Sequence, residues 1–155
     1  MDKKLLSKAY KAGCRGLIFG LESASQNVLN HMKKNIIIST VEDVIINCYD
    51  VVIDVGCFFI IGYVNETEKD FENILQFVKK NYKYIKTIYS SSGLHILKGS
   101  ELYEEAEKYQ IILPEFSPDG EWCTADRSNT SKIRNERLKR FNDLISELYS
   151  KKEAV

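Results

Sequence analysis

The sequence has no surplus of charge, because 22 lysines and arginines stand against 22 aspartates and glutamates. A chain with balanced charge lacks the excess of basic residues with which proteins bind nucleic acids and anionic membrane surfaces, so we expect neither as a partner. It also has no long apolar run, since the stretch from Cys57 to Ile61 is far shorter than the roughly 20 residues that span a bilayer. No apolar export segment follows the charged start, and we therefore expect a cytoplasmic protein.

Cysteine is scarce and scattered. The four cysteines lie at positions 14, 48, 57 and 123, and none stands two or three residues from another. This spacing excludes a zinc knuckle, a redox pair and a cluster motif within the chain, and we expect all four thiols to be inert. The phosphate-binding glycine fingerprints are absent as well, and no Ser-His-Asp or zinc pattern stands out.

The chain does have an alternation of strand-like and helix-like segments. Three short apolar runs, 14–21, 54–62 and 84–89, are typical of buried strands, and the segments between them repeat apolar residues at helical spacing. The second run is apolar on both faces, which predicts a strand covered on both sides. Strands separated by helices imply parallel βαβ units, so we predict an α/β fold.

Capping patterns predict where several helices begin. Ser25 and Ser100 are candidate N-caps, whereas the Ser39 to Glu42 segment fits a capping box and Thr67 starts a further helix. Loops are expected over 110–130, followed by an amphipathic helix over 131–150. In that last helix, we interpret the lysines and arginines of 132–140 as a solvated face.

The unusual residues fall at the carboxyl ends of the predicted strands, where parallel α/β folds bind their ligands. The first strand ends in Gly20-Leu21-Glu22-Ser23, and the second ends in Phe59-Ile60-Ile61-Gly62, followed by Tyr63-Val64-Asn65-Glu66-Thr67. The third leads to a loop that contains Gly93 and then Lys98-Gly99-Ser100-Glu101-Leu102-Tyr103.

These three endings, in this order, resemble the turns after strands four, five and six of radical S-adenosylmethionine enzymes. The best match is to the cobalamin-binding-domain and methylthiotransferase-like branch. The resemblance covers roughly residues 1–110 and implies a partial TIM-like barrel of about three βα units, strands four to six of a radical SAM barrel. Residues 111–155 would be an irregular linker and a C-terminal amphipathic helix.

The resemblance also implies a role for individual residues. Glu22 matches the strand-four residue that contacts the ribose hydroxyls of S-adenosylmethionine, since a carboxylate accepts from two hydroxyls at once. Lys34 matches the basic residue that pairs with the methionine carboxylate. Ile60 and Gly62 match the segment that packs against the adenine, and Ser23 is a neighbour in the same site.

Without the resemblance, plainer interpretations apply to the same residues. Glu22 would be a carboxylate at the start of the following helix, and Lys34 would be a solvated surface lysine. Even with the resemblance, Glu66 fits a first-turn helix acid better than a catalytic base. We expect His31 and His95 to have structural or surface roles. No catalytic residue and no metal ligand is assigned in this chain.

The family's Cys-x-x-x-Cys-x-x-Cys loop, which binds a [4Fe–4S] cluster, has no counterpart in this sequence. The resemblance therefore implies the C-terminal portion of an enzyme that reductively cleaves S-adenosylmethionine at such a cluster, to start radical chemistry on an unknown substrate. Cobalamin is a further cofactor that the branch allows for the parent. The chain is expected to be inactive alone. Its expected partner is the missing N-terminal half-barrel, or a second copy of itself that associates through the exposed first strand.

Two other hypotheses compete with this one. The chain would otherwise be a non-catalytic α/β module, derived from such a barrel, that binds a partner protein through its apolar edge strand. The third hypothesis, an unrelated nucleotide-binding or TIM-barrel enzyme, ranks last because the phosphate-binding glycine patterns are missing.

Overall fold

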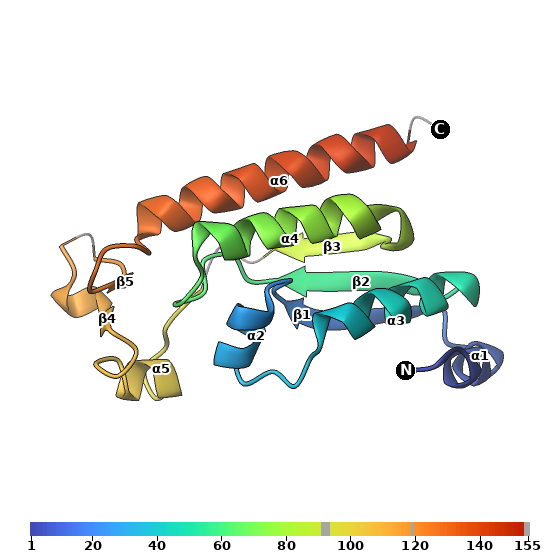
Figure 1. Ribbon diagram of the computed structural model, residues 1–155, viewed down its shortest axis with the longest axis horizontal. Coiled ribbons are helices and arrows are strands. Elements are labelled where there is room, and N and C mark those ends of the chain that lie inside the picture. The colour runs from blue at the N-terminus through green and yellow to red at the C-terminus, as the bar shows by residue number, and fades with distance from the viewer. Residues whose placement is uncertain (91–93, 119, 154–155) are drawn as a thin grey trace.

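The computed structural model describes residues 1–90, 94–118 and 120–153 (Figure 1). Its centre is a parallel sheet of β1 (Gly16–Glu22), β2 (Asp54–Phe59) and β3 (Thr87–Ser90), in that order. The predicted α/β class and the parallel βαβ units are confirmed. The third strand is shorter than predicted, because Tyr82–Tyr84 form a 3-10 turn, η1, before it. Gly93, expected in the loop after β3, lies outside the described residues.

Helices and a small hairpin complete the described structure. The sheet is joined and flanked by α1 (Lys3–Lys11), α2 (Gln26–His31), α3 (Ile38–Asp50) and α4 (Glu68–Asn81). Beyond β3 come α5 (Glu101–Glu104), the two-stranded hairpin of β4 (Ile111–Ile112) and β5 (Cys123–Thr124), the 3-10 turn η2 (Pro114–Phe116) between those strands, and α6 (Ser131–Glu153). The division of the chain at residue 110 stays a prediction.

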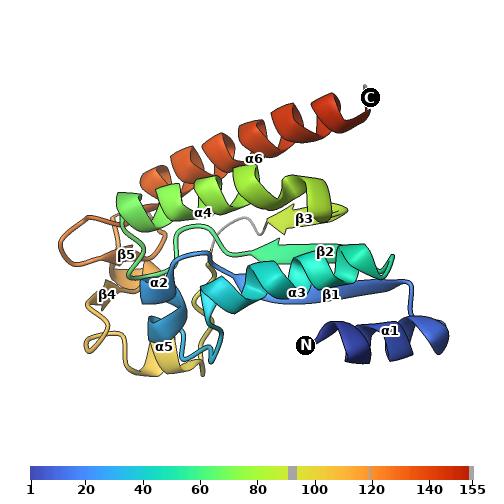
Figure 2. The same cartoon turned by 45° about the vertical axis from the view of Figure 1, so that its right-hand side comes forward.

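One face of the sheet is covered by α3 and α4, with α6 packed along α4 and against β3 (Figures 1 and 2). Val55, Cys57 and Phe59 alternate toward this face and are at most 1% exposed. The ring of Phe59 meets that of Phe77 from α4 and that of Phe141 from α6, at centroid distances of 6.3 and 5.6 Å. This interlayer contact is the main apolar core, whose burial stabilises the fold.

The opposite face, which we call the open face, carries Ile18, Gly20, Gly56, Phe58 and Tyr89. Ile18, Phe58 and Tyr89 are 62%, 43% and 36% exposed. The rings of Phe58 and Tyr89 stack with their centroids 4.5 Å apart. The prediction of a second strand covered on both sides is therefore wrong, because apolar side chains alone do not reveal whether a neighbour covers them.

Two of the predicted caps are confirmed. Thr67 accepts a hydrogen bond from the Asp70 amide at 3.2 Å, and Asp70 accepts one from the Thr67 amide at 2.9 Å, which completes a capping box. Ser100 caps α5 by accepting from the Tyr103 amide. Such caps satisfy backbone donors that the first helical turn leaves free.

The capping box predicted at Ser39 and Glu42 is wrong. The helix begins earlier, at Ile38, and no side chain caps it. Glu42 instead pairs with Lys80 at 2.6 Å and accepts from the Asn81 amide group at 3.0 Å. A partner on α4 therefore takes the carboxylate that the local pattern assigned to the backbone.

The final helix, α6, is the longest of the described elements. It packs through Phe141, which is fully buried, and the Tyr149 hydroxyl donates to the carbonyl of Ile85 at 2.9 Å. Neither α6 nor any other helix in the described part of the chain is long and apolar enough to cross a membrane.

Candidate functional site

All three sheet strands run in the same direction, so their carboxyl ends lie at one end of the molecule (Figure 1). In both views α2, α5 and the β4–β5 hairpin gather at this end (Figure 2). The turns predicted to carry ligand contacts are therefore on neighbouring elements. Ligands of parallel α/β folds bind at this end because the loops there converge.

Glu22 and Lys34 come together at this end. The Lys34 ammonium lies 3.2 Å from Oε1 of Glu22 and 3.4 Å from the carbonyl oxygen of Gly20. The Glu22 side chain is 18% exposed and that of Lys34 is 38% exposed, so solvent reaches both. The pair is thus accessible to a ligand.

A strand irregularity aims the Glu22 carboxylate. The pairing register of β1 with β2 shifts between Gly20 and Glu22, and Glu22 has a positive φ of 68°. Irregularities of this kind redirect a side chain and are common beside functional sites. The backbone amide of Ile60 donates to the Glu22 carbonyl at 2.9 Å, which fixes the bent segment. Ile60 therefore lies beside Glu22.

Gly20 provides the space that the carboxylate occupies. A Cβ at Gly20 would lie 2.6 Å from Oε1 of Glu22 and 3.7 Å from the Lys34 ammonium. Gly20 is two residues from Ile18 on β1, so both face the open side. Across the sheet, Gly20 pairs with Phe58 and Phe58 pairs with Tyr89. The carboxylate therefore stands in line with two stacked aromatic rings.

Ser23 is buried behind this pair. It is fully buried, and its hydroxyl accepts from the Ser25 amide at 3.1 Å. The Ser25 hydroxyl in turn donates to Asp70 at 2.5 Å. The prediction that the Ser25 side chain caps α2 is therefore wrong. Burial opposes ionisation of Asp70, but hydrogen bonds from Ser25 and Thr67 hold its pKa below the ordinary value. Ser23 thus supports the turn and does not line the accessible site.

Gly62 is also buried, beneath α6. It has a φ of 81°, and a Cβ there would clash with the Arg134 side chain, 2.7 Å from its Cδ. Its amide donates to Glu66 at 3.0 Å, and its carbonyl accepts from the Asn129 amide group at 3.3 Å. The structure brings Glu22, Lys34 and Ile60 together and places Gly62 in the support below them.

The prediction of a solvated basic face on α6 is wrong for two arginines. Arg134 and Arg137 are 6% and 5% exposed. Arg134 stacks on the Trp122 ring at 3.7 Å and donates to the Trp122 carbonyl at 2.9 Å. A guanidinium tolerates such burial because its planar group can stack and donate at once.

Glu66 is the partner of Arg137. Arg137 donates to the Glu66 carbonyl at 3.0 Å and to its Oε1 at 3.3 Å, and a further nitrogen lies 3.1 Å from Glu68. Glu66 precedes the Thr67 cap, so the prediction that it is a first-turn acid of α4 is wrong. Burial raises the pKa of Glu66 to about 7, although Arg137 and the Gly62 amide favour the carboxylate. Its Oε2 has no hydrogen-bond partner among the described residues.

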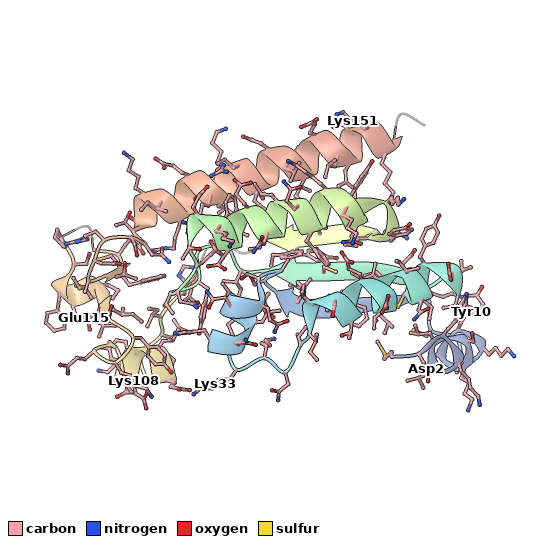
Figure 3. All side chains as sticks on the ribbon, viewed as in Figure 1. Asp2, Tyr10, Lys33, Lys108, Glu115 and Lys151 are labelled. Carbon is pink, nitrogen blue, oxygen red and sulfur yellow. The ribbon has the colours of Figure 1, made fainter. Side chains whose placement is uncertain are left out.

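A second cluster at this end was missed by sequence reasoning. The His31 ring lies between those of Tyr63 and Tyr109, with centroids 5.6 and 5.4 Å away. The Tyr109 hydroxyl donates to Glu101 at 2.7 Å, and Lys33 pairs with the same carboxylate. Burial and nearby Lys33 lower the pKa of His31. Figure 3 shows Lys33 at the end where α2 and α5 lie. Only the tertiary fold joins these residues, so no sequence pattern indicates them.

The thiols do not form a metal site. Cys48, Cys57 and Cys123 are buried and Cys14 is partly buried, as free thiols. Within residues 1–90, 94–118 and 120–153, no three His, Cys, Asp or Glu side chains are grouped so that they could hold a metal ion. These cysteines therefore do not fit the ligand set of a [4Fe–4S] cluster.

Comparison of the chain with protein-family models found no match, and comparison with curated proteins found none either.

Proposed function

We propose that this chain is the C-terminal half of a radical SAM barrel, corresponding to its strands four to six, and that Glu22 and Lys34 contact S-adenosylmethionine. The observation that carries the proposal is the accessible Glu22–Lys34 pair at the carboxyl end of β1, beside the open face. A parallel sheet with helices on one side and an open opposite side has the layering of a barrel segment.

The two charged groups fit the two polar parts of the ligand. Glu22 offers carboxylate oxygens that accept from both ribose hydroxyls, and Lys34 offers an ammonium to the methionine carboxylate. The ligand must first separate the two side chains from each other. That costs little, because a solvent-accessible ion pair contributes about 0–1 kcal/mol.

The chain's own part in the reaction is to bind and orient. Its cysteines do not fit the ligand set of the cluster. The Glu22 bend, fixed by the Ile60 amide, holds the carboxylate at one end of the open face. The partner of this half-barrel is an N-terminal half-barrel that carries the cluster loop, and reductive cleavage belongs to that assembly.

Nuclear magnetic resonance titration of the full chain with S-adenosylmethionine tests the proposal. The amides of Gly20, Glu22 and Ile60 should shift saturably, and Glu22→Gln should weaken binding about tenfold through loss of charge-assisted hydrogen bonds. Glu42→Gln is the matched control, since Glu42 pairs with Lys80 on another surface. Absence of shifts at these amides up to about 5 mM ligand, or equal weakening by both variants, would refute the proposal.

A second candidate function is a non-catalytic protein-interaction module. The apolar side chains of the open face favour it, since exposed patches of this kind mark association surfaces. Its partner would be a second copy that pairs along the edge strand β1. Sedimentation of the full chain separates the two candidates, because a stable concentration-dependent dimer that ignores S-adenosylmethionine supports the module, whereas a strict monomer contradicts it.

A further inference from the structure

The opposite end of the sheet holds a cavity. It lies where β2 and β3 begin, next to the last residues of α3 and α6, and has a volume of about 520 Å³. This is within the range of about 300–1,000 Å³ that small-molecule sites occupy. Its lining includes Tyr49, Val52, Lys83, Tyr84, Lys86 and Lys152.

The cavity has an apolar lining and an aromatic rim. Ile53, Val55 and Ile85 line it and are at most 2% exposed. The rings of Tyr49 and Tyr84 meet edge to face, with centroids 5.2 Å apart, and Tyr49 is 57% exposed. Such a surface accepts a flat apolar group against an exposed ring.

Three lysines and one carboxylate, that of Asp54, line the cavity. Lys83 lies 4.8 Å from the centre of the Tyr84 ring, and the Lys152 ammonium donates to the Ile85 carbonyl at 3.1 Å. Neither lysine forms an ion pair with a carboxylate of the described residues, whereas Lys86 pairs with Asp54. Two ammonium groups beside one cavity thus keep donors for an anion.

Backbone strain presents an apolar side chain at the same place. Val52 follows the end of α3 with a φ of 62°, and it is 70% exposed. A left-handed conformation disfavours β-branched residues, and glycine is usual at this position after a helix. The folded chain gains little from an exposed valine in that conformation. A ligand whose apolar part covers Val52 would gain binding free energy by removing this side chain from water.

We infer that this cavity is a binding site for a small aromatic phosphate ester, in which the ring lies against Tyr49 and Val52 and the phosphate meets Lys83 and Lys152. Lysine binds phosphate as a point charge, and a dianion with several oxygens can accept from two ammonium groups at once. The balanced charge of the whole chain argues for a small anion over a nucleic acid. The site is independent of Glu22 and Lys34, which lie at the other end of the sheet.

Titration of the full chain with phenyl phosphate, followed by nuclear magnetic resonance, tests the inference. The amides around Val52, Lys83 and Lys86 should shift saturably, with phenol and inorganic phosphate each binding more weakly than the ester. Lys83→Gln and Lys152→Gln should each weaken binding about two- to fivefold, and added salt should weaken it further.

Lys151→Gln is the matched control, because Lys151 lies in the same turn of α6 as Lys152 but pairs with Glu147 at 2.6 Å (Figure 3). It should leave binding unchanged, as should Glu22→Gln. Circular dichroism of each variant checks that the fold is kept. Equal weakening by Lys151→Gln, phenol binding as tight as the ester, or shifts confined to other amides would overturn the inference. None of these outcomes bears on S-adenosylmethionine binding, which has its own ligand and amides.

Discussion

The two ends of the sheet differ in whether their charged side chains are paired. At the carboxyl end, Glu22 and Lys34 already hold each other, and the buried pair of Glu66 and Arg137 lies among the supporting contacts. At the amino end, Lys83 lines the same cavity as the strained, exposed Val52 and has no carboxylate partner among the described residues. A ligand at the carboxyl end must exchange partners, whereas an anion at the amino end adds one. We therefore expect selectivity at the first end and salt-sensitive attraction at the second.

The largest expected change in stability comes from a substitution in the contacts that support the carboxyl end of the sheet. Gly62→Ala places a Cβ against the Arg134 side chain at a φ of 81°. Overpacking and the left-handed conformation together should lower the free energy of unfolding by about 3 kcal/mol. Urea denaturation of both proteins measures this loss.

Gly99→Ala is the matched control for that loss. Gly99 has a similar φ of 87°, but a Cβ there would have no atom within 4 Å. Only the conformational cost of about 1 kcal/mol should appear. If the two variants lose equal stability, the contact of Gly62 with Arg134 does not matter.

The buried carboxylate of Glu66 should make stability depend on pH. Its folded-state pKa of about 7 lies above the ordinary 4.5, so its contribution is full below pH 4.5 and is lost as the pH rises through 7. Between about pH 5 and about pH 8 the native chain should lose about 2 kcal/mol that Glu66→Gln does not lose. Urea denaturation at both pH values measures the difference.

Glu68→Gln is the control, because it keeps Glu66 and should lose the same stability as the native chain between about pH 5 and about pH 8. Hydrogen bonds from Arg140 and Arg137 lower the pKa of Glu68, so its contribution is present at neutral pH and is lost on acidification through the folded-state pKa. A parallel pH trend in the two variants would contradict the assignment of the effect to Glu66.

At the amino end, Val52→Gly should stabilise the chain. Glycine adopts the φ of 62° without the Cβ strain, so thermal unfolding should show a gain of about 1 kcal/mol. The same change should weaken phenyl phosphate binding, because it removes an apolar contact. A loss of stability would show that Val52 is held by the fold itself.

The smallest effect on stability is expected at Gly20. A Cβ there would meet only the movable ends of the Glu22 and Lys34 side chains, so Gly20→Ala should cost less than about 1 kcal/mol. It should still weaken S-adenosylmethionine binding by displacing the carboxylate. Gly16→Ala is the control, since its Cβ would make ordinary contacts at 3.8 Å or more. Equal binding by both variants would separate Gly20 from the site.

The parallel βαβ units follow from the sequence because they depend on local signals. Apolar runs between helical segments indicate parallel strands, and the Thr67–Asp70 box forms within four residues. The contact of Glu22 with Lys34 was not predicted; Glu22 ends β1 and Lys34 lies in the loop after α2, so a short stretch of chain brings them together.

Arg134 and Arg137 show what local patterns cannot provide. They stand among other charged residues of 132–140, and only their contacts with Trp122 and Glu66 reveal their burial. The local sequence around Glu42 likewise fits a helix cap, but in the structure Glu42 pairs with Lys80 from another helix. Charge pairs between residues far apart in the chain determine whether these side chains are buried or exposed. A single sequence shows no spacing pattern from which such pairs could be predicted.

Lys33 and Lys34 are neighbours in the chain, yet they point to separate clusters. The positive φ of Lys33, 57°, turns the backbone so that Lys33 reaches Glu101 while Lys34 reaches Glu22. A carboxylate that draws Lys34 away from Glu22 will therefore pull on the residue anchored to α5. The rings of His31 and Tyr109 beside that anchor become a built-in reporter, whose proton resonances should register occupation of a site that they do not touch.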